Sequence, residues 1–301
     1  MSTEQLLLTK SKAPVPGGFD WGRLVRYLAL FAGLIFVLIP VYVLVITSFK
    51  TVGDADPSRA WAFPQVWSLN SWKASWFGST ALPSVGAALG RTAMMVIPAS
   101  IISSMLGSMN GFVLSKWRFP GANIVFTVIL FGMFIPYQAV MVPLFQLMSS
   151  LWQTTPLSQG IWSLVLLHVV YGIPITTLIF RNYYQNVPQE LIEAARVDGA
   201  GMLGTYFRVI LPISIPSFVV VFIWQFTSAW NDFLFATFFG GNPTTMAPVT
   251  VTLNMLAKGS MLADYGAAMS GALLASVPTL IIYILLGRYF IGGLMAGSVK
   301  G

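Results

Sequence analysis

The side chains best suited to chemistry in this sequence lie inside long apolar stretches. His168, the single histidine, lies in one stretch, and Asn231 and Asp232 lie in another. Groups of these types inside apolar segments either line a path for protons or a polar solute, or they bond to neighbouring helices. The other ionisable residues of the stretches are arginines near the predicted ends, where long side chains reach water. These groups are too sparse for a proton relay.

A second polar group lies between two apolar stretches. Only 8% of the chain is Asp, Glu, Lys or Arg, yet five such residues occur between Glu190 and Pro212: Glu190, Glu193, Arg196, Asp198 and Arg208. Pro188 favours a helix start, and the glutamates suit the positive end of that helix. We expect one polar and one apolar flank. The predicted polar flank is Glu190, Glu193 and Arg196, and the predicted apolar flank is Leu191, Ala194, Ala195 and Val197.

Glycines end this predicted helix at Gly199 and Gly201, and a second short helix is expected over Met202–Ile210, before Pro212 opens the next apolar stretch. Two short helices at an angle predict a protruding knob. The segment from Gly199 to Gly204 also matches G-x-G-x-x-G. The dinucleotide fingerprint requires a preceding strand, whereas a helix is expected here, so we reject that interpretation.

Composition places both groups in a membrane protein. The chain is 56% hydrophobic with a mean hydropathy of +0.78, which exceeds what a soluble domain can bury. Cysteine is absent, and the 16 basic residues are scattered singly, which does not indicate a nucleic-acid partner. Windows of about 20 apolar residues predict an all-α integral membrane fold. The six expected spans are Leu24–Ser48, Leu89–Leu114, Ala122–Met148, Ile161–Tyr184, Pro212–Phe238 and Gly271–Ile291.

Lysines and arginines orient these spans. With a cytosolic N-terminus, eleven basic residues fall on the cytosolic side and five on the other, as the positive-inside rule requires. The prediction is a cytosolic tail over residues 1–23, a six-helix domain over 24–292 with a cytosolic loop at 185–212, and a cytosolic tail over 293–301. Both termini and the knob, between spans four and five, are therefore expected in the cytosol.

The knob resembles a known motif. Its sequence is similar to EAA-x3-G-x9-I-x-LP, the EAA loop of binding-protein-dependent ABC importer permeases. The matching residues are Glu193-Ala194-Ala195, then Gly199 after three residues, then Val209 to Pro212 after nine more. Val209 stands where the pattern has Ile. The segments SKWRFPG, IPYQAVMVPLF, WNDFLF and GRYFIGGLMAGSVKG extend the resemblance over residues 20–301, to the carbohydrate subfamily related to the second permease of the maltose system. The details look most like permeases for glucose and related monosaccharides, and an oligosaccharide stays open.

The resemblance implies a multi-pass permease subunit in a prokaryotic inner or plasma membrane. Its implied partners are a second permease subunit, a cytosolic ATPase dimer and an external solute-binding protein. ATP and Mg would be bound by the ATPase, so no cofactor is expected on this chain, which has no G-x-x-x-x-G-K-[ST] motif. The C-terminal residues Gly297–Gly301 either reach the ATPase or stay solvated.

The resemblance also assigns candidate site residues. The implied ATPase-docking residues are Glu193, Ala194, Ala195, Arg196, Asp198 and Gly199; the alternative is a plain turn between two spans. Sugars require hydrogen-bonding groups and aromatic faces. The candidates for the solute path are therefore His168, Trp224, Trp230, Asn231 and Asp232; the alternative is that they only bond to or cap neighbouring helices.

Two other functions fit the sequence less well. A stand-alone ion-coupled secondary transporter normally carries carboxylates or histidines within the membrane, and these are sparse here. A membrane-embedded enzyme needs clustered acids, histidines or a metal set. One histidine and no cysteine argue against an enzyme.

Overall fold

The computed structural model describes residues 21–79, 82–117, 119–152, 160–242, 246–260 and 264–295. Every regular element in that part is a helix, as the sequence predicted. The chain divides into two compact units, Met1–Leu44 and Val45–Gly301. The predicted terminal tails fall outside the described residues, except at 21–23 and 293–295, which belong to the first and last helices.

The first unit contains most of α1 (Trp21–Ser48). Its 28 residues correspond to about 42 Å of helix, enough to cross a hydrocarbon core of ~30 Å. Charged residues occur only in its first turns, at Arg23 and Arg26. This helix matches the predicted first span, extended by three residues at its start.

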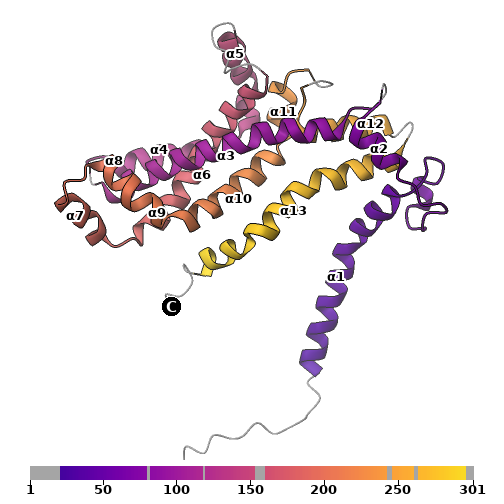
Figure 1. The fold of residues 1–301 in the computed structure, drawn as a ribbon, viewed down its shortest axis with the longest axis horizontal. Helices are drawn as coiled ribbons and strands as arrows, with labels where there is room; N and C mark the ends of the chain where they lie inside the picture. Colours follow the sequence, from indigo (N-terminus) through magenta and orange to yellow (C-terminus); the bar gives the residue numbers. More distant parts are fainter. Residues whose placement is uncertain are drawn as a thin grey trace, which may run out of the picture. The chain divides into compact units, whose positions relative to one another are not determined.

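The second unit is built on four helices that run along one another: α3 (Val85–Lys116), α6 (Ile161–Gln185), α10 (Ile215–Trp230) and α13 (Tyr265–Met295) (Figure 1). The α3–α6 contact is the most extensive. It depends on small residues, because a Cβ at Gly107 would clash with Thr176 and one at Gly111 would meet Phe180 and Arg181. Close backbone approach at small residues is typical of helix pairs in membranes.

Two of the predicted spans are bent rather than straight. Helices α4 (Ala122–Phe134) and α5 (Met141–Trp152) meet at 85°, with the 3₁₀ turn η2 (Tyr137–Val140) between them. Pro136 precedes this turn and cannot donate a backbone hydrogen bond, which explains the break. By length and composition, four described helices could cross a membrane, or up to six if each bent pair is one span.

The second bend follows the knob. Helix α8 (Met202–Thr205), the π-helical turn η4 (Tyr206–Ile210) and α9 (Leu211–Ile213) run together, and α10 departs from them at 80°. The predicted helix over Met202–Ile210 therefore continues to Ile213. The expected span Pro212–Phe238 is divided, because α10 ends at Trp230 and α11 (Leu234–Phe239) is separate.

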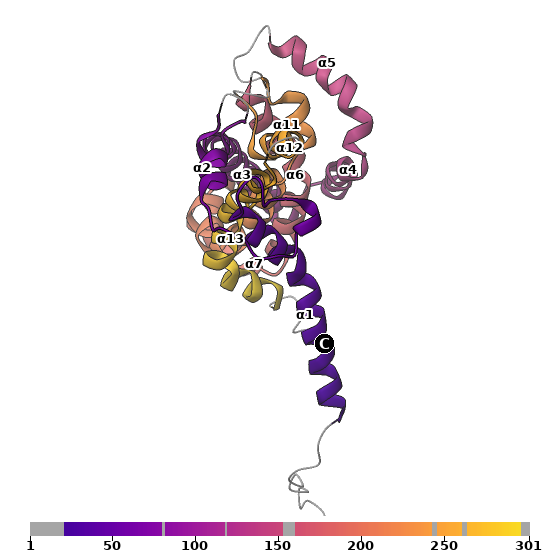
Figure 2. The same cartoon turned by 90° about the vertical axis from the view of Figure 1, so that its right-hand side faces the viewer.

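Short helices lie at both ends of the bundle. Helices α2 (Asn70–Phe77), α11 and α12 (Val249–Ser260) gather at one end, and α7 (Gln189–Val197) lies at the other (Figures 1 and 2). The turn η1 (Pro57–Arg59) precedes α2. Ser75 ties α2 to α13, since its hydroxyl bonds the carbonyl of Ala267 at 2.5 Å and the hydroxyl of Ser270 at 2.7 Å.

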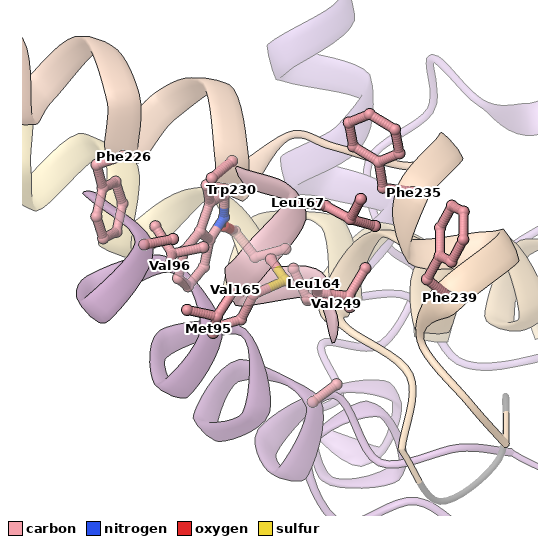
Figure 3. Packing of buried hydrophobic residues seen from close by; sticks show 14 of the residues in the cluster. Met95, Val96, Leu164, Val165, Leu167, Phe226, Trp230, Phe235, Phe239 and Val249 are labelled. Carbon is pink, nitrogen blue, oxygen red and sulfur yellow. The ribbon is translucent and has the colours of Figure 1, made fainter. Parts of the chain in front are cut away.

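The main core lies between α3, α6, α10, α11 and α12 (Figure 3). Met95 and Val96 of α3 face Leu164 and Val165 of α6 in this cluster. Packing and hydrogen bonding, rather than hydrophobicity alone, hold helices together in lipid. The core therefore fixes the ends of α6, α10 and α11 relative to one another, and the first candidate site lies beside it.

Candidate functional site

A large open cavity of about 1070 Å³ lies beside this core. Its walls come from α4, η2, α5, α6, α10 and the start of α11. The wall is mainly apolar, with polar groups concentrated on α6 and α10. The polar and aromatic lining residues are Tyr137, His168, Tyr171, Trp224, Gln225, Ser228, Asn231, Asp232, Phe233 and Phe235.

One face of α10 and of the turn that follows it carries most of the polar lining. Trp224 and Ser228 are one helical turn apart, and Asn231 and Asp232 follow within the next turn. This spacing places them on the same side of a helix. The structure thus brings the predicted residues Trp224, Asn231 and Asp232 to one surface, together with Ser228, which the sequence did not single out.

His168 faces the same cavity from α6. Its Nε2 atom lies 3.6 Å from Oδ2 of Asp232, with side-chain exposures of 7% and 12%. That distance exceeds a hydrogen bond, and Nε2 of His168 has no hydrogen-bond partner in the described part of the chain. Asp232 instead caps α11, because its two carboxylate oxygens accept the amides of Phe235 at 3.3 Å and Ala236 at 2.9 Å.

An aromatic cluster surrounds the histidine. Phe235 packs edge-on against His168 with ring centroids 5.7 Å apart, and it contacts Tyr171 at 5.0 Å and Tyr137 at 5.4 Å. Gln225 fixes the backbone there, since its amide donates to the carbonyl of His168 at 3.0 Å. These contacts leave the histidine ring little freedom to move.

Trp230 does not share this site, contrary to the sequence-based expectation. It is absent from the cavity lining and is only 4% exposed. Its ring stacks on Phe226 with centroids 5.3 Å apart, and its indole N–H donates to the carbonyl of Ala275 at 3.0 Å (Figure 3). At 100° per residue, Trp230 lies on the face of α10 toward α13, whereas Asn231 lies toward the cavity.

The knob at the other end of the bundle begins with α7. Ile192 and Ala195 are buried against the bundle, with exposures of 0% and 7%, whereas Leu191 and Val197 are exposed at 42% and 88%. Of the predicted apolar flank, only Ala195 is buried, so that prediction was wrong for Leu191, Ala194 and Val197. Residues i and i+3 share a helix face, so Ile192 and Ala195 form the inward side and the other three residues point outward.

The remaining predicted docking residues lie on the outward side. Glu193, Ala194, Arg196, Asp198 and Gly199 are exposed. Gly199 ends α7 with a φ of +79° and open space around its Cα, so the backbone conformation alone favours glycine there. Ala200 closes the turn, since its amide bonds the carbonyl of Ala195 at 2.9 Å.

Polar contacts fasten the knob to the bundle. The buried Nζ of Lys116 donates to the carbonyl of Val187 at 2.6 Å, and the guanidinium of Arg196 lies 4.2 Å from the ring centre of Trp117. Together with Gln189 and Glu193, these side chains line a groove of about 240 Å³. The end of α3 is thus bonded directly to the connection between α6 and α7.

A buried hydroxyl network continues this connection into the bundle. Ser108 of α3 bonds Tyr184 of α6 at 2.6 Å and accepts a bond from Tyr206 of η4 at 2.9 Å. Phe112 packs between both tyrosine rings. Hydrogen bonds and ring contacts therefore connect the knob to both α3 and α6.

The polar and aromatic cavity residues that sequence reasoning missed are Tyr137, Tyr171, Gln225, Ser228, Phe233 and Phe235. The helical periodicity of α10 would have indicated two of them, because Ser228 and Gln225 lie one and two turns before Asp232, which follows the end of the helix. No comparable signal marks Phe235, which joins the site through the break between α10 and α11.

These features define a class of protein. It is a helical membrane protein with apolar spans and a cavity beside its core, and the knob at one end carries the EAA-type motif. The chain belongs to the family described as binding-protein-dependent transport system inner membrane component, whose model matches residues 103–293. It is therefore an ABC importer permease.

Individual relatives extend the match over nearly the whole chain. The xylose/arabinose import permease protein XacI of Haloferax volcanii is 36% identical, covering 94% of this chain and 98% of that protein. A probable ABC transporter permease protein of Pyrococcus horikoshii is 48% identical over 58% of this chain and 61% of its own length. A crystal structure of a bacterial ABC transporter involved in the import of the acidic polysaccharide alginate has the same fold, with a TM-score of 0.74 at 18% identity, covering 92% of this chain and all of that one.

Proposed function

We propose that this subunit forms half of the membrane pathway of a sugar importer, with a monosaccharide of the glucose or pentose type as solute. Family membership supports import with a binding protein. The observation that carries the sugar assignment is the similarity, over 94% of the chain, to a permease named for xylose and arabinose. The polar and aromatic cavity wall suits such a solute.

Energy enters from a partner in this proposal. A cytosolic ATPase dimer binds ATP and Mg, closes, and moves the docked knob through Glu193, Ala194, Arg196, Asp198 and Gly199. The bond from Lys116 to Val187 and the Ser108 hydroxyl network pass this displacement to α3 and α6. Taking an inward–outward equilibrium from 1:99 to 99:1 requires about 5.5 kcal/mol of differential binding.

The proposed complex also contains a second, related permease and an external solute-binding protein. The open cavity on this subunit then faces the second permease, and the binding protein delivers sugar on the side opposite the knob. Both termini lie in the cytosol, as the distribution of lysines and arginines favours.

Uptake by the reconstituted complex tests this function. The subunit is reconstituted with its ATPase, second permease and binding protein in liposomes, and entry of labelled glucose, xylose and arabinose is measured. We expect ATP-dependent entry of at least one sugar that stops when the ATPase is omitted. Entry through this chain alone, driven by an ion gradient, would instead establish a secondary transporter.

A further inference from the structure

The cavity lining contains few charged side chains. The described lining residues include no lysine or arginine, and Asp232 is the one carboxylate among them. Both oxygens of that carboxylate accept backbone amides. An anionic solute would meet this negative group with no lysine or arginine in the described lining to offset the repulsion, which is costly away from water. The wall suits a neutral solute with many hydroxyl groups.

His168 supplies the observation that points to a ligand. Its side chain is 7% exposed, and the residue belongs to the cavity lining. Its Nε2 atom is buried and has no hydrogen-bond partner in the described structure, although Oδ2 of Asp232 lies 3.6 Å away. Leaving a buried polar atom without a hydrogen bond is unfavourable, so a partner for this nitrogen would be stabilising. A hydroxyl group satisfies either state of this nitrogen, since a hydroxyl both donates and accepts.

The surroundings hold His168 in place for this bond. Gln225 fixes the backbone of His168, and Gly172 makes room for it, since a Cβ there would clash with the Gln225 amide. Phe235 packs against the imidazole edge-on. The unpartnered nitrogen is thus held by contacts with neighbouring helices rather than by a flexible loop.

The dimensions of the wall set the size of the ligand. The polar face runs over nine residues, from Trp224 on α10 to Asp232 just past its end, a rise of about 12 Å at helical spacing. The volume of about 1070 Å³ lies at the upper end of the ~300–1,000 Å³ usual for small-molecule sites. Trp224, which is 51% exposed, and Tyr171 offer rings for stacking.

We propose that this subunit itself holds a subsite for a neutral sugar, in which Nε2 of His168 bonds a sugar hydroxyl and the α10 face supplies further polar contacts. The subsite rests on the proposed function and adds to it a place of binding and a charge class. Ser228, exposed at the middle of the α10 face, is the position from which to detect it.

The chain contains no cysteine, so one introduced thiol reports on one position. Ser228→Cys is prepared in the complete transporter, and its alkylation is timed with glucose, xylose, arabinose or the acidic sugar glucuronate present. We expect a transported neutral sugar to slow the reaction at least about threefold and glucuronate to leave it unchanged. Ser150→Cys, an exposed position on α5 outside the cavity lining, is the control and should show no protection.

Two failures are distinguishable in this experiment. Transporters that take up a neutral sugar yet show no protection at Ser228→Cys, or equal protection by glucuronate, overturn the subsite and leave the proposed function standing. Absence of ATP-dependent sugar uptake in the parent transporter overturns the proposed function.

A substitution at His168 tests the named hydrogen bond. We expect His168→Leu to raise the KM for uptake about tenfold with little change in kcat and with normal ATPase co-purification. His168→Gln, which keeps a polar side chain, should recover part of the affinity. An unchanged KM in His168→Leu would overturn the role of Nε2, whereas a purely structural role would lower kcat and subunit yield together.

Discussion

At the scale of single residues, burial distinguishes the side chains that are available at the two candidate sites from those that only pack the helices together. Ala195 and Trp230 were candidates by residue type, yet one faces the bundle and the other packs between α10 and α13. Residue type and spacing predicted His168, Asp232 and Gly199 as special positions. Which way a side chain points depends on neighbours from distant parts of the chain. The local sequence pattern therefore cannot predict it.

Gly199 gives a sharp test at this scale, because its φ of +79° is unfavourable for a side chain while its surroundings are open. An alanine in the left-handed region costs ~1–2 kcal/mol. We expect Gly199→Ala to distort the end of α7 and to lower sugar uptake per ATP hydrolysed several-fold. Co-purification of the ATPase and coupled transport are the measurements.

Gly201 provides the matched control two residues further on. Its φ is −71°, and an alanine Cβ at this position would have no neighbouring atom within 4 Å, so Gly201→Ala should leave coupling intact. Gly199→Asn should be milder than Gly199→Ala, because asparagine tolerates this backbone conformation. Equal coupling in Gly199→Ala and Gly201→Ala would contradict the account.

At the scale of elements, the structure explains which helices the sequence could predict. Spans of about 20 apolar residues are recognisable because lipid requires them, and α1, α3, α6 and α13 followed that rule. Helix α12 was missed, since 12 residues with interspersed polar positions lack a span signal. Pro136 interrupts the expected third span and permits a kink, but a proline does not fix the kink angle, so the 85° bend could not be predicted. The 80° bend at Ser214 was missed.

The α3–α6 contact tests the packing at this scale. A Cβ at Gly107 would clash with Thr176, and overpacking a tight contact costs ~1–3 kcal/mol. We expect Gly107→Ala to lower the thermal unfolding temperature of the detergent-purified subunit. Gly90→Ala, on the same helix with open space around it, should leave that temperature unchanged or raise it slightly. Identical unfolding of the two variants would refute tight packing at Gly107.

At the scale of the whole molecule, the second unit places the two sites at different parts of one bundle, with α6 reaching both. His168 lies on α6 beside the cavity, and Tyr184 of the same helix joins the hydroxyl network next to the knob. Their separation of sixteen positions along α6 corresponds to about 24 Å of helix. A displacement of the knob therefore has a direct helical route to the solute wall, which is the central claim of the proposed mechanism.

Crosslinking from the knob tests that claim most directly. In the cysteine-free chain, Ala194→Cys places a thiol on the exposed side of α7 and Ala195→Cys places one on the buried side. We expect a short thiol-reactive crosslinker to join the exposed position to the ATPase subunit, with a yield that changes when ATP binds, and to react poorly at the buried position. Crosslinks from Ala194→Cys that reach only lipid or this chain itself would contradict the claim.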